Sequence, residues 1–280
     1  MYLHAEHASS GLWTHWLEEP ASAITLAALT ATYAVGTLRV WRQAGVGHGI
    51  RRWQVAAFAA GVTTLAIALL SPIGALAEAL FWMHMVQHVL LAVIAPPFLV
   101  AGAPIVAALW VLPSSPRRRA LLAVRRQRWL VRAWYGVTQP LVACGIHAVA
   151  LWVWHWPALY VAALTHPAVH VLEHTSFVGT AVLLWWAIIH PRSSRRDGYA
   201  LGVVALFLTT LQSGALGALL SLSNHVLFPA QSAALARGIT PLEDQQLAGL
   251  VMWVPAGILY MLAMAVVFRA WMRTLQPAAV

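Results

Sequence analysis

Two pairs of histidines, each in or beside a strongly apolar stretch, are the residues of this chain best suited to chemistry. His84 and His88 lie in FWMHMVQHVLL, and His170 and His174 lie in HVLEHTSF. The i,i+4 spacing directs both rings of a pair to one face of a helix. Imidazole is the commonest metal ligand among side chains, and ionisable groups inside a membrane usually mark a functional site. We therefore predict that the four histidines hold a metal ion or a haem.

Five further residues are predicted to support this site, each with an alternative interpretation. Met85 and Met252 offer thioethers, which together with imidazole suit Cu(I), although methionine more often fills gaps in a core. Gln87 and Glu173 each precede a paired histidine, and we expect them to accept hydrogen bonds from imidazole N–H groups. Glu173 is alternatively an ordinary interfacial carboxylate. His155 ends an apolar segment, where a single histidine is more often a hydrogen-bonded interface residue.

The composition indicates that the elements positioning these residues are membrane helices. The chain has 280 residues, of which 61% are hydrophobic and 9% are charged, whereas a soluble domain carries about 25% charged residues. We expect one all-α polytopic domain over residues 1–280. The single cysteine, Cys144, excludes an intrachain disulfide and a cysteine metal motif. The sequence also lacks a phosphate-binding loop, a nucleophile elbow and an HExxH run, so we do not expect an enzyme.

Seven apolar segments approach the roughly 20 residues that a spanning helix needs. They are residues 21–41, 53–70, 78–100, 136–156, 170–190, 200–222 and 247–269. Pro96 and Pro97 interrupt the third segment, and apolar sequence continues to Leu112. Because proline removes a backbone donor, we expect either a long kinked helix or a helix followed by a short interfacial one. The fold class is therefore a seven-helix transmembrane bundle.

The arginines fix the expected orientation. All 17 basic residues except Arg237 fall in four regions, namely residues 39–52, 113–135 and 191–199 and the C-terminal end from residue 269. With seven spans these regions lie on one side, so the positive-inside rule places the N-terminus outside and the C-terminus in the cytoplasm. The net charge of +9 is thereby explained without nucleic acid. The stretch 114–133 is either a topology anchor or an amphipathic helix on the anionic inner leaflet.

Four ordered stretches resemble the CtaG-type assembly factors of caa3-type cytochrome c oxidase. They are HMVQHVLLAVIAPP from His84, WHWPALY from Trp154, HVLEHTSF from His170 and DQQLAGLVMWVPAG from Asp244. The resemblance implies a seven-helix protein of the bacterial plasma (inner) membrane that assists the maturation of a haem–copper oxidase. It also implies copper delivery, with the copper-bearing oxidase subunit as the partner.

The leading hypothesis is therefore a copper-binding assembly factor, a chaperone that holds copper through His84, His88, His170 and His174 near the outer surface. A haem-binding membrane redox protein is the first alternative, although two close histidines on one helix fit it less well. A copper permease is the second alternative, but it would need polar groups through the inner half, where the sequence offers few. A scaffold whose histidines only form hydrogen bonds is the third.

Overall fold

The computed structural model describes residues 20–191, 195–228, 234–235 and 237–275, and within these ranges the chain is helical without any strand. The long helices are α1 (Pro20–Ala44), α2 (Arg52–Leu70), α11 (Pro167–Ile189), α12 (Arg195–Leu222) and α14 (Pro241–Leu275). The shorter elements are α3 (Pro72–Ala79), α4 (Phe81–Val89), the π-helical η3 (Leu90–Ile94), α5 (Ala95–Ala101), α6 (Pro104–Val111), α7 (Ser114–Arg126), α8 (Arg128–Val137), α9 (Pro140–Trp154) and α10 (Pro157–Thr165). The predicted all-α class is confirmed.

All seven predicted apolar segments are helical, but the fourth is broken. Six helices are long and apolar enough to cross a membrane, and there are seven if α8 and α9 count as one span bent by 73°. The break falls just before Pro140, because a residue that precedes proline is disfavoured in a helix. With 15 residues, α9 alone is about 22 Å long, which is short of a hydrocarbon layer of about 30 Å.

The third segment accommodates its two prolines inside one continuous helix. The chain passes from α4 through η3 into α5 without a break, and the N–H of Ala95 donates to the carbonyl of Leu90, five residues back. A proline ring crowds the carbonyl four residues before it, so this wider turn makes room for Pro96 and Pro97. A short helix, α6, then follows the left-handed Ala103. The segment thus contains both a long helix and a short one after it.

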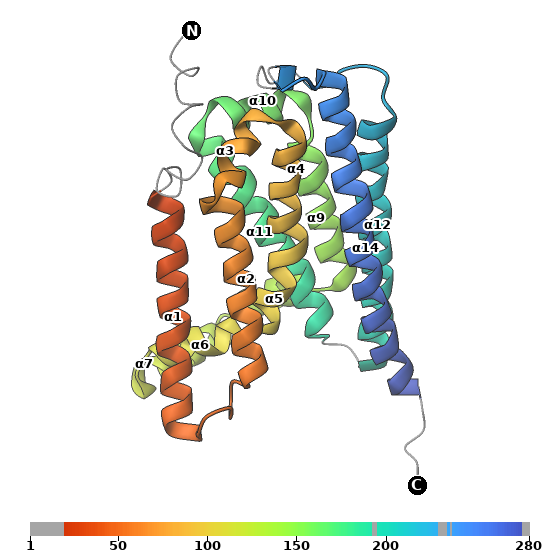
Figure 1. Ribbon diagram of the computed structural model, residues 1–280. Coiled ribbons are helices and arrows are strands. Elements are labelled where there is room, and N and C mark those ends of the chain that lie inside the picture. The colour runs from red at the N-terminus through yellow and green to blue at the C-terminus, as the bar shows by residue number, and fades with distance from the viewer. Residues whose placement is uncertain (1–19, 192–194, 229–233, 236, 276–280) are drawn as a thin grey trace.

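The helices pack in two groups, one around α4 and the other around α5 (Figure 1). α4 lies against α3 and α14, while α5 lies against α2 and α11. α12 and α14 run side by side along most of their length. Their backbones approach closely, since a Cβ on Gly249 would lie 2.5 Å from the carbonyl oxygen of Gly217. Small residues at a crossing let membrane helices make such contact.

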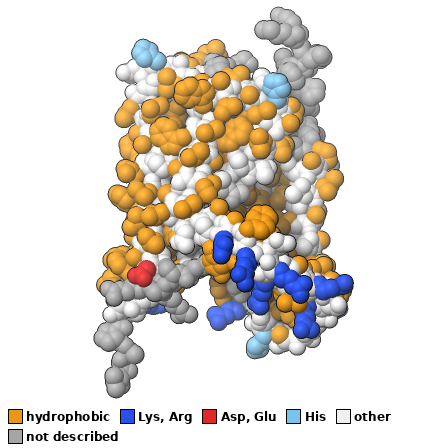
Figure 2. Space-filling model, turned by 180° about the vertical axis from the view of Figure 1, so that it is seen from behind, with side chains coloured by type: hydrophobic (Ala, Val, Ile, Leu, Met, Phe, Trp, Pro, Cys, Tyr) orange, Lys and Arg blue, Asp and Glu red, His pale blue; other side chains and the backbone are white. Residues whose placement is uncertain are grey.

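The surface is apolar around the bundle and strongly basic at one end. Exposed apolar side chains such as Phe207, Leu262 and Val266 cover the sides, as expected of a surface that faces lipid. Figure 2 shows arginines gathered at one end of the molecule. The helices α7 and α8 have no buried residue and carry seven of them: Arg117, Arg118, Arg119, Arg125, Arg126, Arg128 and Arg132. α4 begins at the opposite end (Figure 1).

Candidate metal centre

The two histidine pairs meet inside the bundle, which the sequence alone could not show. Within each pair the i,i+4 spacing places both rings on one helix face, with centroids 4.2 Å apart for His84 and His88 and 4.1 Å apart for His170 and His174. Between the pairs, the His88 and His174 centroids are 5.7 Å apart, and His84 lies 6.2 Å from His170. Four imidazoles from α4 and α11 therefore surround one small volume.

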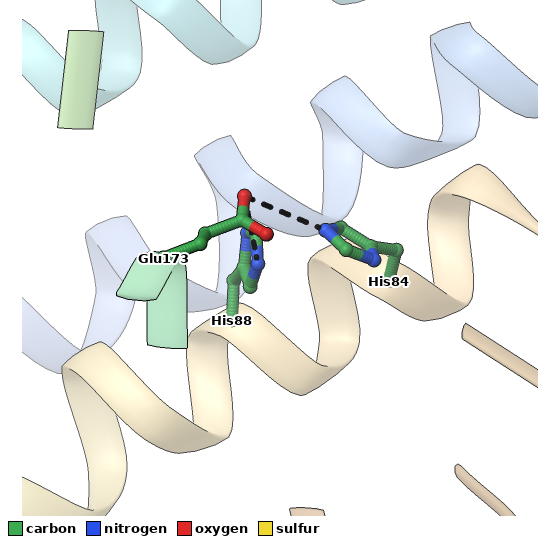
Figure 3. A group of neighbouring side chains, drawn as sticks. All are labelled: His84, His88 and Glu173. Carbon is green, nitrogen blue, oxygen red and sulfur yellow. Dashed lines mark ion pairs between the residues drawn. The ribbon is translucent and has the colours of Figure 1, made fainter. Parts of the chain in front are cut away.

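Glu173 belongs to two clusters of potential ligands in this group, and Figure 3 shows the one with His84 and His88. Its Oε1 atom lies 3.8 Å from Nε2 of His84 and 3.6 Å from Nε2 of His88. Glu173 also forms a second cluster with His170 and His174, in which the ligand atoms lie within 4.8 Å of one another. Two ligands bonded at about 2.0–2.1 Å to one tetrahedral ion lie about 3.3 Å apart. The observed separations thus need only small side-chain rotations to reach metal coordination.

The donor atoms of the centre are buried and lack hydrogen-bond partners. Both oxygens of Glu173, both ring nitrogens of His88, and Nε2 of His84 and His174 are buried without a hydrogen bond. Glu173, His84 and His88 are at most 6% exposed, whereas His170 and His174 are half-buried. Because buried polar groups are almost always hydrogen-bonded, such a concentration of unpaired atoms fits a set of ligands for a cation.

Residues from three other helices hold α4 in place. The carboxylate of Asp244 on α14 accepts hydrogen bonds from the backbone N–H groups of Phe81 at 3.0 Å and Trp82 at 2.9 Å. It thereby caps the positive end of α4 one turn before His84. On the far side, Nε2 of Gln87 donates to the carbonyl of Ala68 on α2 at 2.8 Å. α3 also packs against α4.

The five residues that were predicted to support the site have different positions in the structure. Glu173 is the shared central group and not an interfacial carboxylate, since it is only 1% exposed. Gln87 is directed to α2, so it does not accept hydrogen bonds from the imidazoles as expected. His155 is buried, with its ring centroid 6.1 Å from that of His88. Met85 and Met252 are also buried, and they line a small cavity together with His88 and His155.

Two residues of the centre were missed by the sequence interpretation. The first is Asp244, whose partner Phe81 is 163 residues away along the chain, so no local pattern could link them. The second is Tyr160 on α10, whose ring stacks edge-on against His84 with centroids 5.5 Å apart. Burial, together with Asp244 and Glu173, raises the pKa of the Tyr160 phenol, which keeps it neutral. Both lie in stretches that carry the family resemblance, which was the only available signal.

The fold and the centre define a polytopic helical membrane protein with a buried histidine–carboxylate cluster. Comparison with known proteins places it more closely, because the model of the cytochrome c oxidase caa3 assembly factor family (Caa3_CtaG) matches residues 31–274. The chain belongs to this family. No curated protein and no solved structure matches it.

Proposed function

We propose that this protein binds copper at the centre formed by Glu173 and the four surrounding imidazoles, and delivers it to the copper-bearing subunit of a caa3-type oxidase. Membership of the assembly factor family supports the oxidase as the client. The observation that supports a metal ion is the position of the buried Glu173 carboxylate. It lies close to both His84 and His88 and has no hydrogen-bond partner. The chain acts as a carrier by binding and releasing an ion, without enzymatic catalysis.

Imidazole nitrogens and one carboxylate are donors that suit copper. Imidazole binds copper, zinc, iron and nickel, and copper binds most tightly among the divalent first-row ions. The thiol of Cys144, the chain's only cysteine, lies within hydrogen-bonding distance of Thr209 and the carbonyl of Ala205. It does not belong to the centre. Copper binding here therefore rests on nitrogen and oxygen donors.

The arrangement of charge supports an orientation for delivery in the bacterial plasma membrane. The arginines of α7 and α8 gather at the end opposite the start of α4. By the positive-inside rule that end lies in the cytoplasm, with the N-terminus outside. The centre then lies near the outer surface, and the half-buried His170 and His174 form its more accessible side. Copper would reach the centre from outside.

The alternative functions receive less support from the same region. The cavity that adjoins His88 and His155 has a volume of about 30 Å³, which suits an ion or a water and is far too small for a porphyrin. A permease would need polar groups that are free to bind an ion along a path beyond the cavity. The hydroxyl of Thr209 is not free in this way, because it donates to the carbonyl of Ala205 at 2.8 Å and contacts Cys144.

Copper analysis of the purified protein tests the proposal. After loading and removal of free metal, the wild-type protein is expected to retain copper, and the His84→Ala, His174→Ala double variant is expected to lose most of it. A control, the His48→Ala, His190→Ala double variant, removes two exposed histidines outside the centre and should retain wild-type copper. Equal copper in both double variants, or none in the wild type, would sink the proposal.

The same variants test delivery. In cells that carry the double variant of the centre, the caa3 oxidase should assemble with a lower ratio of copper to haem than in cells with the control variant. An oxidase with full copper content in both strains would contradict the delivery role while leaving copper binding intact.

A further inference from the structure

A small cavity lies beside the Glu173 centre, further along α4 in the chain direction. Its volume is about 30 Å³, and Met85, His88, His155 and Met252 are among its lining residues, with His147 at the far side from the centre along α9. A space of this size holds a water molecule or a single ion. The cavity is distinct from the Glu173 centre, and His88 is the residue that borders both.

His155 has the tautomer of a metal ligand. Its Nδ1 lies 2.7 Å from the carbonyl oxygen of Leu151, so Nδ1 carries the proton and donates it. Its Nε2 therefore presents a lone pair, and this atom is buried without a hydrogen-bond partner. Metal-ligating histidines characteristically donate their second N–H to a backbone carbonyl in this way. The side chain is 8% exposed and lines the cavity.

Two thioethers complete a soft ligand set. Met85 stands three residues before His88 on α4, so both side chains lie on one face of that helix. Met252 reaches the cavity from α14. Both methionines belong to the same buried cluster and are 1% and 6% exposed. Thioether and imidazole ligands together favour Cu(I).

We propose that Met85, His155 and Met252, with His88 shared between the two sites, form a second, deeper site that is selective for Cu(I). Copper passes from the Glu173 centre as Cu(I), by exchange of ligands at His88. His88 ligates one site at a time and keeps its N–H proton, so neither an electron nor a proton is transferred. His88 is suited to this role because both of its ring nitrogens are buried without hydrogen bonds, and Nε2 alone faces Glu173. This second site rests on the proposed function, because it receives its copper from the Glu173 centre.

Anaerobic titration of the full-length protein with Cu(I), against a chelating competitor, tests this site. The wild-type protein is expected to bind a second equivalent of Cu(I), and copper X-ray absorption should show sulfur among the ligands. In the Met85→Leu, Met252→Leu double variant, one equivalent and the sulfur signal should both be lost. Methionine and leucine have similar volumes, so the double variant is expected to keep the wild-type fold.

The matched control is the Met83→Leu, Met261→Leu double variant. Met83 lies on α4 but packs in a different cluster, and Met261 lies on α14 with 56% exposure. This variant should keep both equivalents and the sulfur signal. Selenomethionine protein provides a measurement that needs no substitution, since selenium X-ray absorption should detect copper as a direct neighbour of selenium after loading.

The possible failures are distinguishable. If the wild type binds one equivalent with only nitrogen and oxygen ligands, and selenium has no copper neighbour, the second site is refuted while copper binding at Glu173 stands. If the wild type binds no copper at all, the proposed function fails, and the second site fails with it. Loss of sulfur ligands in the control variant as well would also refute the assignment to Met85 and Met252.

Discussion

Oε1 of Glu173 lies 3.6 Å from Nε2 of His88, and the two groups come from different helices, α11 and α4. The distance is too long for a hydrogen bond, yet it is close to the separation of about 3.3 Å between two ligands of one tetrahedral ion. Both residues are almost fully buried. The contact between the two histidine-bearing helices is therefore centred on groups that attract a cation.

The first prediction concerns the charge of Glu173. In the Glu173→Gln variant the side chain keeps its shape but cannot contribute an anionic ligand. We expect copper affinity to fall about tenfold or more, which corresponds to about 1.4 kcal/mol or more. The copper-free variant should unfold at the same or a higher temperature than the wild type, because a buried carboxylate without a hydrogen bond destabilises the fold. Thermal unfolding in detergent, with and without copper, measures both effects.

Copper itself provides the internal comparison. A ligand present at a hundred times its dissociation constant stabilises the folded state by about 2.7 kcal/mol, so the wild type should show a clear increase in unfolding temperature on loading. Glu173→Gln should show a smaller increase at the same copper concentration. A variant that is destabilised without copper, but responds to copper as the wild type does, would mean that Glu173 has a purely structural role.

The second prediction concerns the cap that Asp244 provides. Its two carboxylate oxygens accept from the N–H groups of Phe81 and Trp82, both at the start of α4. The Asp244→Ala variant leaves both donors without a partner, and we expect a loss of about 1–3 kcal/mol in the free energy of unfolding. Copper affinity should fall as well, because His84 lies within the first turns of α4. Thermal unfolding and copper titration measure these two quantities.

Glu243 is the matched control, because it is the neighbouring acidic residue in the first turn of α14. Among the residues that the structure describes, its carboxylate accepts hydrogen bonds only from Thr240, at the exposed start of its own helix. Glu243→Ala should leave copper affinity unchanged. If Glu243→Ala and Asp244→Ala reduce copper affinity equally, the cap on α4 is not what positions the histidines.

The features that were predictable from the sequence depend on local periodicity. An i,i+4 spacing places His84 with His88, and His170 with His174, on one helix face whatever the tertiary structure. Long apolar runs likewise become helices in a membrane, because only helices satisfy their backbone within one segment. The break before Pro140 shows the limit of this reasoning, since an apolar run alone does not show that it is straight.

The rotation of each helix within the bundle was not predictable. Gln87 and Glu173 have equivalent places in their segments, each one residue before the second histidine of a pair. On α11, Glu173 and Phe177 form the buried face, so the carboxylate enters the centre. On α4, the neighbouring helix α2 offers the carbonyl of Ala68, and Gln87 is directed there instead. Contacts between helices decide this difference, and sequence spacing does not encode them.

The third prediction tests the close crossing of α12 and α14. A Cβ on Gly249 would lie 2.5 Å from the carbonyl oxygen of Gly217 and 2.4 Å from Oγ of Ser221. The Gly249→Ala variant must therefore push the two helices apart, and we expect a loss of about 1–3 kcal/mol in stability. The control is Gly257→Ala on the same helix, where a Cβ would meet nothing within 4 Å. That variant should be neutral or stabilised by up to about 1 kcal/mol. Thermal unfolding compares the two, and equal unfolding temperatures would show that the crossing is not tightly packed.

The fourth prediction concerns orientation, and the chain suits the experiment because its only cysteine, Cys144, is buried. His48 lies in the exposed loop between α1 and α2, at the arginine-rich end, whereas Asn224 is exposed in the loop after α12. With the N-terminus outside, a membrane-impermeant thiol reagent should label the Asn224→Cys variant in intact cells. It should label the His48→Cys variant only after the membrane is permeabilised. The opposite pattern would place the arginines outside, against the positive-inside rule, and would make the Glu173 centre open toward the cytoplasm. Copper delivery from the outer side requires the first pattern, so this labelling decides from which side the metal can reach His170 and His174.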